Sequence, residues 1–170
     1  MKKRLIAASI VFVLLMPLIF SGCNNPEQEG FAIYLTKDNV PVSQMEALSH
    51  VEIANVPVFS DKDIISYSKE SHEIELTAEA YERVMQLEVP TTGKSFVVCV
   101  DRSPIYWGAF WTPLSSISFN CVMIGVPSSS EQENTIRLAL GYPLPSFYQG
   151  EDPRSNPVIL ESLDKAGKLK

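Results

Sequence analysis

Residues 71–76, Ser-His-Glu-Ile-Glu-Leu, and the segment that follows them decide the fold class. Their alternation places Ile74 and Leu76 on one face of a half-buried strand and the glutamates on the other. Thr77 then caps a helix over 78–88, in which apolar residues recur at helical spacing. A strand that leads at once into an amphipathic helix indicates a domain that contains both kinds of element.

Further runs of strand-forming residues lie on both sides of this stretch. Residues 135–140 fit either a strand or the end of a helix, and the alternation of their apolar side chains favours a strand. Short helices are expected over 60–65 and near 158–163. The other expected strands are 31–36, 96–100, 105–111 and 119–126. We therefore predict an α+β fold: a single small domain with a mostly antiparallel or mixed sheet of about four to six strands and two or three short helices on one face.

The N-terminus has the layout of a secretory signal. Residues 1–4 carry three basic side chains, and residues 5–20 contain no charged side chain. That run is shorter than the ~20 apolar residues that a helix needs to cross a bilayer, and Ser21 and Gly22 are small enough for a signal peptidase. We expect residues 1–22 to be a cleavable signal peptide.

Residues 20–23, Phe-Ser-Gly-Cys, resemble the lipobox of bacterial lipoproteins, whose first position is usually leucine. The resemblance implies that Cys23 receives a diacylglyceryl thioether, and two acyl chains make a stable anchor. Residues 23–30 would then be the lipidated cysteine and a polar leash. The protein is expected on the outer face of the cell membrane, or on the periplasmic side in a two-membrane cell. Ordinary secretion and a short signal anchor are the alternatives.

The domain after the leash is acidic. We expect residues 31–150 to form the α+β domain and residues 151–170 a C-terminal extension with the short helix. The chain has a net charge of −6, and loss of a signal peptide with three basic and no acidic residues leaves −9. Such a domain is a poor partner for nucleic acid, and it lacks the Lys/Arg cluster that attracts proteins to anionic lipid. The lipid on Cys23 is therefore the expected contact with the membrane.

The stretch from 57 to 126 resembles the head of the first periplasmic domain of SecD, an accessory subunit of protein export. The shared landmarks are Asp63-Ile64, residues 73–77, the helix with Tyr81 and Val84, Thr91-Thr92-Gly93, the strand 96–101 and residues 122–125. The resemblance implies a small α+β sheet that contacts polypeptide and performs no catalysis. SecD acts with membrane helices, and this chain has no segment of membrane-spanning length after residue 20, so we do not expect it to drive export alone.

Cys99 and Cys121 remain once Cys23 is assigned to lipid. Outside the cytosol they could form a disulfide, which would stabilise the domain by on the order of 3 kcal/mol for a loop of this length. The alternative is a pair of small buried thiols, the usual environment of free cysteine. The thiols are favoured because the sequence does not establish an oxidising habitat.

Residues 106–111 contain four aromatic side chains. In a strand, Trp107 and Trp111 share one face, and Tyr106 and Phe110 share the other. If the tryptophans are exposed, they provide a binding surface for a peptide or a sugar. The alternative is that one pair belongs to the core and the other packs under a loop.

The sequence contains no HExxH, GxSxG, P-loop or GxGxxG motif. His72 falls on the apolar face of its strand, which favours a hydrogen-bonded core histidine, and His50 has no visible partner. We assign no catalytic residue, metal or cofactor. Two functions remain: a non-catalytic, membrane-tethered binding or accessory domain that contacts a protein or peptide, and an extracytoplasmic hydrolase with His72 or His50 in a polar cleft.

Overall fold

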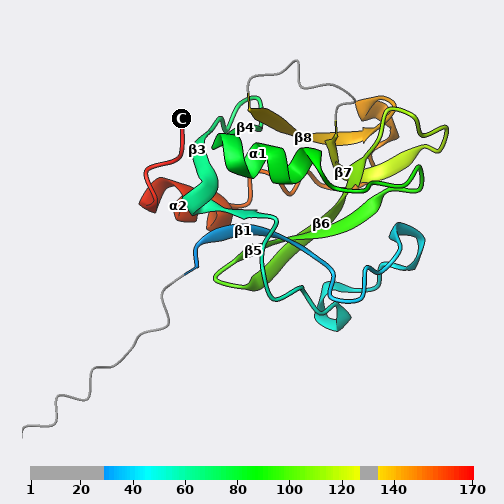
Figure 1. The fold of residues 1–170 in the computed structure, drawn as a ribbon, viewed down its shortest axis with the longest axis horizontal. Coiled ribbons are helices and arrows are strands. Elements are labelled where there is room, and N and C mark those ends of the chain that lie inside the picture. Colours follow the sequence, from blue (N-terminus) through cyan, green and yellow to red (C-terminus); the bar gives the residue numbers. More distant parts are fainter. Residues whose placement is uncertain (1–28, 127–133) are drawn as a thin grey trace, which may run out of the picture.

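The computed structural model describes residues 29–126 and 134–170 (Figure 1). The strands are β1 (Phe31–Leu35), β2 (Phe59–Ser60), β3 (Ile64–Tyr67), β4 (Glu73–Leu76), β5 (Lys94–Val100), β6 (Ser103–Trp111), β7 (Phe119–Gly125) and β8 (Thr135–Tyr142). The helices are α1 (Ala78–Met85) and α2 (Pro157–Lys165), with 3-10 turns η1 (Val42–Gln44), η2 (Leu48–His50), η3 (Asp61–Asp63) and η4 (Pro145–Phe147). Cys23 and the predicted signal peptide, 1–22, lie outside the described residues.

All eight strands form one mixed sheet in the order β2-β1-β5-β6-β7-β8-β4-β3. Every pairing is antiparallel except that of β6 with β7. The two edge strands, β2 and β3, are consecutive in the chain and are joined only by η3, so the sheet curls back on itself. The α+β prediction is confirmed, and the prediction of four to six strands is wrong because the sheet has eight.

The stretch 71–88 folds largely as its pattern predicts. Ile74 and Leu76 are fully buried in β4, and the Thr77 hydroxyl accepts a hydrogen bond from the Ala80 amide at 3.3 Å, which caps α1. The buried face of α1 consists of Ala80, Tyr81 and Val84. The helix ends at Met85, earlier than the predicted Glu88, with Gln86 as its C-cap.

The helix predicted over 60–65 is only a single 3-10 turn. The Ser60 amide donates to the Asp63 carboxylate at 2.9 Å, which is half of a capping box. The chain then becomes β3, with Ile64 buried and Ile65 exposed. Two consecutive β-branched residues favour the extended strand over a continued helix, so the helical prediction is wrong beyond Asp63.

The main core lies on the face of the sheet that carries both helices (Figure 1). Its buried side chains come from all eight strands, and they are joined by Ala80, Tyr81 and Val84 of α1 and by Ile159 and Leu163 of α2. The Asn156 side chain caps α2 by accepting from the Val158 amide at 2.9 Å. The predicted C-terminal helix is therefore present, and its apolar face belongs to the same core as the sheet.

Two smaller clusters fill the opposite face of the sheet. One contains Tyr34, Val97 and Cys99, packed under Leu48, Val51 and Ile53 of the segment between β1 and β2. The other contains Ala109, Trp111 and Phe119. The sheet is thus buried on both faces, with helices on one side and irregular chain on the other.

Asp101 and Arg102 form the tight turn between β5 and β6. Their φ angles are 49° and 62°, both in the left-handed region that two-residue hairpin turns require. The Asp101 carboxylate accepts a hydrogen bond from the Gly30 amide at 3.0 Å. The Arg102 guanidinium lies 5.1 Å from the centre of the Tyr34 ring. The turn therefore fastens the first described residues to the sheet.

The last residues of the chain pair with edge strand β3. The Tyr67 amide donates to the Lys168 carbonyl at 2.7 Å, and the Lys170 amide donates to the Tyr67 carbonyl at 2.8 Å. None of the helices among the described residues is long and apolar enough to span a bilayer.

Candidate functional site

The four aromatic residues of β6 alternate between the two faces of the sheet, as predicted. Tyr106 and Phe110 are 7% and 0% exposed and belong to the main core. Trp111 is 2% exposed, and Trp107 is half-buried. The structure therefore follows the alternative in which one pair is core and the other packs beneath irregular chain, and the indole rings do not form an open binding surface.

The tryptophan face is covered by a stack of rings. The Trp111 ring lies parallel to that of Phe119, with centroids 4.7 Å apart and an interplanar angle of 11°. The Tyr142 ring lies 6.0 Å from Trp111 and the Phe119 ring 6.1 Å from Trp107. These contacts join β6, β7 and β8 and leave Tyr142 as the outermost aromatic residue of the stack.

A shallow groove lies above this stack, between two loops. It has a volume of about 400 Å³ and is lined by Ser115, Ser116, Ile117, Ser118, Tyr142, Pro143 and Phe147. The Tyr142 hydroxyl lies 3.1 Å from the Ser115 carbonyl and 3.2 Å from the Pro113 carbonyl, and it donates to these acceptors. The Tyr142 side chain therefore ties the end of β8 to the loop between β6 and β7, and these two segments form the walls of the groove. We call this feature the apical groove.

The apical groove exists because β6 and β7 are parallel. Parallel pairing aligns Trp111 with Gly125, so the connection 112–118 must run back along the sheet before β7 begins. Parallel neighbours usually need a crossover of about a dozen or more residues, most often a helix. Seven residues leave no room for a helix, and the apolar side chains of the connection remain at the surface.

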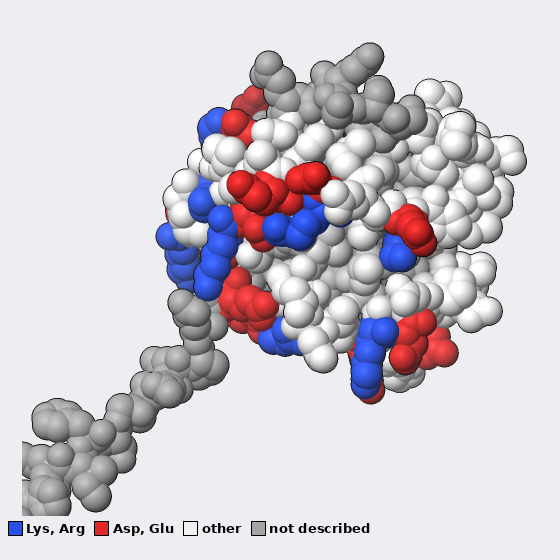
Figure 2. All heavy atoms as spheres, in the orientation of Figure 1, with Lys and Arg blue, Asp and Glu red and all other residues white. Residues whose placement is uncertain are grey.

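Apolar side chains surround the apical groove. Leu114 is 79% exposed, and Ile117, Leu144 and Phe147 are also exposed. Residues 103–126 and 138–150 contain no Asp, Glu, Lys or Arg, although the chain as a whole has 20 acidic and 14 basic residues. This end of the molecule is correspondingly free of charged side chains at the upper right of Figure 2. The two uncharged runs are visible in the sequence. They come together at one end of the molecule only because β6, β7 and β8 are neighbours in the sheet.

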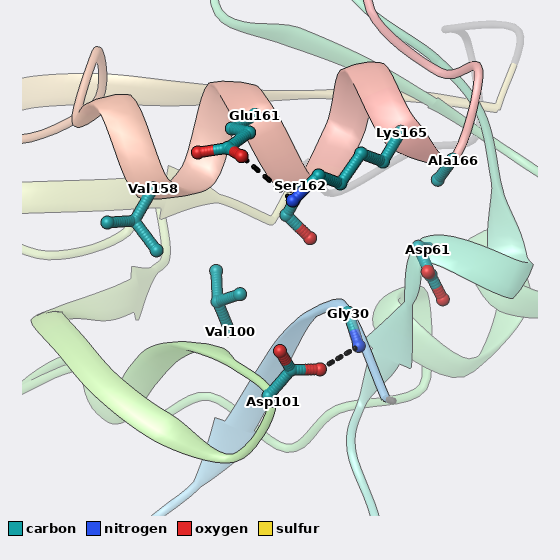
Figure 3. Close-up of a pocket in the computed structure, with 9 residues that line it drawn as sticks. All are labelled: Gly30, Asp61, Val100, Asp101, Val158, Glu161, Ser162, Lys165 and Ala166. Atoms are coloured by element: carbon teal, nitrogen blue, oxygen red, sulfur yellow. Dashed lines mark hydrogen bonds and ion pairs between the residues drawn. The ribbon is translucent and has the colours of Figure 1, made fainter. Parts of the chain in front are cut away.

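A second hollow, the basal cleft, lies where the described chain begins (Figure 3). Its volume is about 310 Å³, and it is lined by Gly30, Asp61, Val100, Asp101, Val158, Glu161, Ser162, Lys165 and Ala166. The figure shows α2 along one side and the Asp101 turn on the other. The cleft is therefore polar and contains charges of both signs.

The charges of the basal cleft are mostly paired within the protein. Lys165 contacts Glu161 at 2.8 Å, and Asp101 binds the Gly30 amide. Asp61 packs so closely that a Cβ on Gly30 would lie 2.3 Å from its carboxylate. Burial raises the pKa of Asp61, and one of its oxygens has no hydrogen-bond partner. These contacts hold the basal cleft together from within. Among the described residues, no group of three His, Cys, Asp or Glu is arranged to hold a metal ion.

His72 is a hydrogen-bonded core residue, as the sequence favours. It is 7% exposed, and its Nδ1 lies 3.0 Å from the Tyr67 hydroxyl. Burial lowers the pKa of His72, and Arg154 lowers it further. Burial also raises the pKa of Tyr67 to about 12. His72 is therefore neutral near pH 7, and it faces a phenol that keeps its proton.

Neither histidine supports the hydrolase alternative. Among the described residues, no serine, threonine or cysteine forms a hydrogen bond with the His72 ring. His50 lies on the surface in an acidic hollow of about 620 Å³, and its only ion-pair partner among the described residues is Glu46, at 3.6 Å. A nucleophile and base within hydrogen-bond reach define a hydrolytic centre of this type, and both histidines lack one.

Cys99 and Cys121 are free thiols in the structure. They lie on β5 and β7, with β6 between them. Neighbouring strands are about 4.8 Å apart, so these positions exceed the roughly 7 Å that a disulfide can bridge between Cα atoms. The free-thiol alternative therefore holds. Burial raises the pKa of Cys99 to about 12 and also raises that of Cys121, which makes both weak nucleophiles.

Acidification is expected to destabilise the fold through His72. Because the folded protein lowers the pKa of His72, the unfolded chain, with a pKa of about 6.5, binds the proton more readily. The free energy of unfolding should therefore fall as the pH drops below about 6.5. Urea unfolding at successive pH values checks this, with His72→Asn as the comparison because asparagine tolerates the positive φ of 55° at this position. Identical pH profiles for the two chains would contradict the assignment.

Comparison with protein-family models, curated proteins and solved structures finds no match to this chain. The lipobox and the resemblance to the SecD head thus rest on the sequence pattern alone.

Proposed function

We propose that this protein is an extracytoplasmic lipoprotein, held at the membrane by lipid on Cys23, and that its domain is a non-catalytic binding or accessory module that contacts polypeptide. The N-terminal pattern supports the first part: three basic residues, an uncharged apolar run and a lipobox-like Phe-Ser-Gly-Cys sequence precede the domain at the spacing of a lipoprotein signal. The SecD-like landmarks between 57 and 126 support contact with polypeptide.

The single observation that carries the binding role is the apical groove. It is a preformed concavity with exposed Leu114 and Phe147 beside it, on a domain that otherwise presents many charged side chains. Exposed apolar patches of this kind mark interaction sites in proteins. Among the described residues, neither His50 nor His72 hydrogen-bonds a serine, threonine or cysteine, so no observation favours the hydrolase alternative.

Metabolic labelling with an alkyne fatty acid tests the lipid anchor. The wild-type chain should take up the label and sediment with membranes, whereas Cys23→Ser should lose the label completely because the variant lacks the thiol that forms the thioether. Cys121→Ser is the matched control and should keep full labelling. Label that persists in Cys23→Ser, or that is absent from the wild-type chain, would overturn the proposal.

A further inference from the structure

We propose that the apical groove binds an uncharged, apolar segment of another polypeptide, in which one or two aliphatic or aromatic side chains enter between the two loops. The inference rests on the proposed function for the orientation of the domain at the membrane. It goes beyond that function by naming the surface and the chemistry of the partner.

The shape of the apical groove suits a side chain flanked by backbone. Tyr142 and Phe147 supply aromatic surface at the base and on one wall, while Ser115–Ser118 form the other wall. The Ser115 hydroxyl is engaged by the Ile117 amide at 3.1 Å, which orders that wall. Ser116 and Ser118 also line this wall and add hydroxyl groups to it. The apolar base suits the side chain of a bound peptide, and the polar wall suits its backbone.

The charge of the surroundings selects against a charged partner. Neither wall of the apical groove contains an ionisable acid or base other than the Tyr142 phenol. A carboxylate or ammonium group that entered would lose water without gaining a counter-charge, which is costly. An uncharged apolar side chain loses only unfavourable contact with water. The groove therefore discriminates by exclusion of charge.

The bilayer that anchors Cys23 is poorly placed to fill the groove. Five residues separate Cys23 from Glu29, the first described residue. A chain extends at most about 3.6 Å per residue, so the lipid lies within roughly 22 Å of Glu29. The loops of the apical groove lie at the opposite end of the domain from the start of β1, two residues after Glu29 (Figure 1). The attachment point therefore lies near the basal cleft, which Gly30 lines, and far from the apical groove.

Binding by strand addition is also disfavoured, which leaves recognition to the groove. One sheet edge, β2, has only two residues, and the other, β3, already pairs with residues 168–170. A partner strand therefore finds no long free edge on this sheet. The domain must therefore bind a partner through side chains. Most of the large apolar side chains that are exposed among the described residues surround the apical groove.

A defined peptide tests the inference with the full-length lipidated protein in nanodiscs. The probe is a fluorescent synthetic peptide of Ser, Leu and Phe with blocked ends. Two control peptides carry Glu or Lys in place of Leu and Phe. Fluorescence anisotropy should show saturable binding of the first peptide alone. Leu114→Lys and Ile117→Lys should each weaken binding by roughly tenfold or more, as expected for residues that dominate an interface.

Val56→Lys is the matched control. Val56 is 75% exposed, close to the 79% of Leu114, but it lies in the segment before β2, whereas Leu114 directly precedes the groove wall Ser115–Ser118. It should leave the anisotropy titration unchanged, and all three variants should unfold at the same urea concentration as the wild-type chain. Equal binding of the charged peptides, or equal effects of all three variants, overturns the inference.

Two other occupants are separate outcomes of the same experiment. If the groove variants alter the sedimentation of the protein in detergent, a second copy occupies the surface and the proposal fails. If they alter only its attachment to empty vesicles, the occupant is lipid and the proposal likewise fails. A protein that carries lipid on Cys23 but binds none of the peptides overturns this inference and leaves the proposed anchor intact.

Discussion

Replacing Phe110 by alanine is expected to lower the free energy of unfolding by about 3–5 kcal/mol, the usual cost of removing a large aromatic side chain from a core. Phe110 is 0% exposed, and its ring centre lies 5.1 Å from that of Phe96. β6 lies in the interior of the sheet, so its neighbours are held by strands on both sides and have little freedom to collapse into the cavity. Equilibrium unfolding in urea measures the change.

Phe147→Ala provides the comparison for Phe110→Ala. The same atoms are removed, but Phe147 is 42% exposed and lies at the rim of the apical groove. A surface truncation of this kind changes stability by only about 0.5 kcal/mol. The slope of the urea transition should be the same in both variants, since the surface exposed on unfolding is nearly unchanged. Similar losses for the two variants would show that Phe110 is not in a rigid core.

Replacing Gly108 by alanine is the second large expected effect. A Cβ at Gly108 would lie 2.4 Å from the Val122 carbonyl oxygen and 2.5 Å from the Phe96 ring. The oxygen belongs to the parallel partner strand, so relief requires a shift of backbone. Overpacking costs typically about 1–3 kcal/mol, which exceeds the roughly 0.4–1 kcal/mol that alanine gains by restricting the unfolded chain. A net loss in the free energy of unfolding follows.

Gly125→Ala is the matched control for Gly108→Ala. Gly125 ends β7, and the nearest atom to a Cβ there is the flexible Met123 methyl at 3.4 Å, an ordinary contact. Its unfolding midpoint in urea should equal or slightly exceed that of the wild-type chain. A stable Gly108→Ala variant would argue against the close parallel pairing of β6 with β7 and, with it, against the course of the loop that forms the apical groove.

The long, patterned segments of this fold are predictable from sequence. The alternation in 73–76, the Thr77 cap and the run 96–100 give strand, helix and strand where the structure has them. Each signal is local: it depends on side chains within one element and on the cap that precedes it. The weak alternation in 135–140 is also correct, and β8 extends it to Tyr142.

The two edge strands are not predictable in this way. β2 has two residues and β3 four, and each owes its extended form to a partner distant in the chain: β2 pairs with β1, and β3 with β4 and the chain end. Ser60 and Asp63 do cap the 3-10 turn η3 at the start of the predicted helix. The helix does not continue beyond Asp63, because Ile64 enters the core as part of β3 and pairs with Leu76 of β4.

The candidate site shows the same limit. The four aromatic residues of β6 are visible in the sequence, and their division between two faces follows from strand geometry. Which face is covered depends on Phe119 and Tyr142, which reach Trp111 from two other strands. The apical groove also needs the parallel alignment of β6 and β7, a long-range property that no local pattern encodes.

The pairing of residues 168–170 with Tyr67 has a consequence for the behaviour of this protein when crowded. An exposed sheet edge is a template on which identical molecules can assemble into fibrils. Here residues 168–170 occupy the backbone hydrogen-bonding groups of Tyr67, the last residue of the four-residue strand β3, and the opposite edge strand, β2, contains only Phe59 and Ser60. Many copies of this domain can therefore be crowded together without joining their sheets.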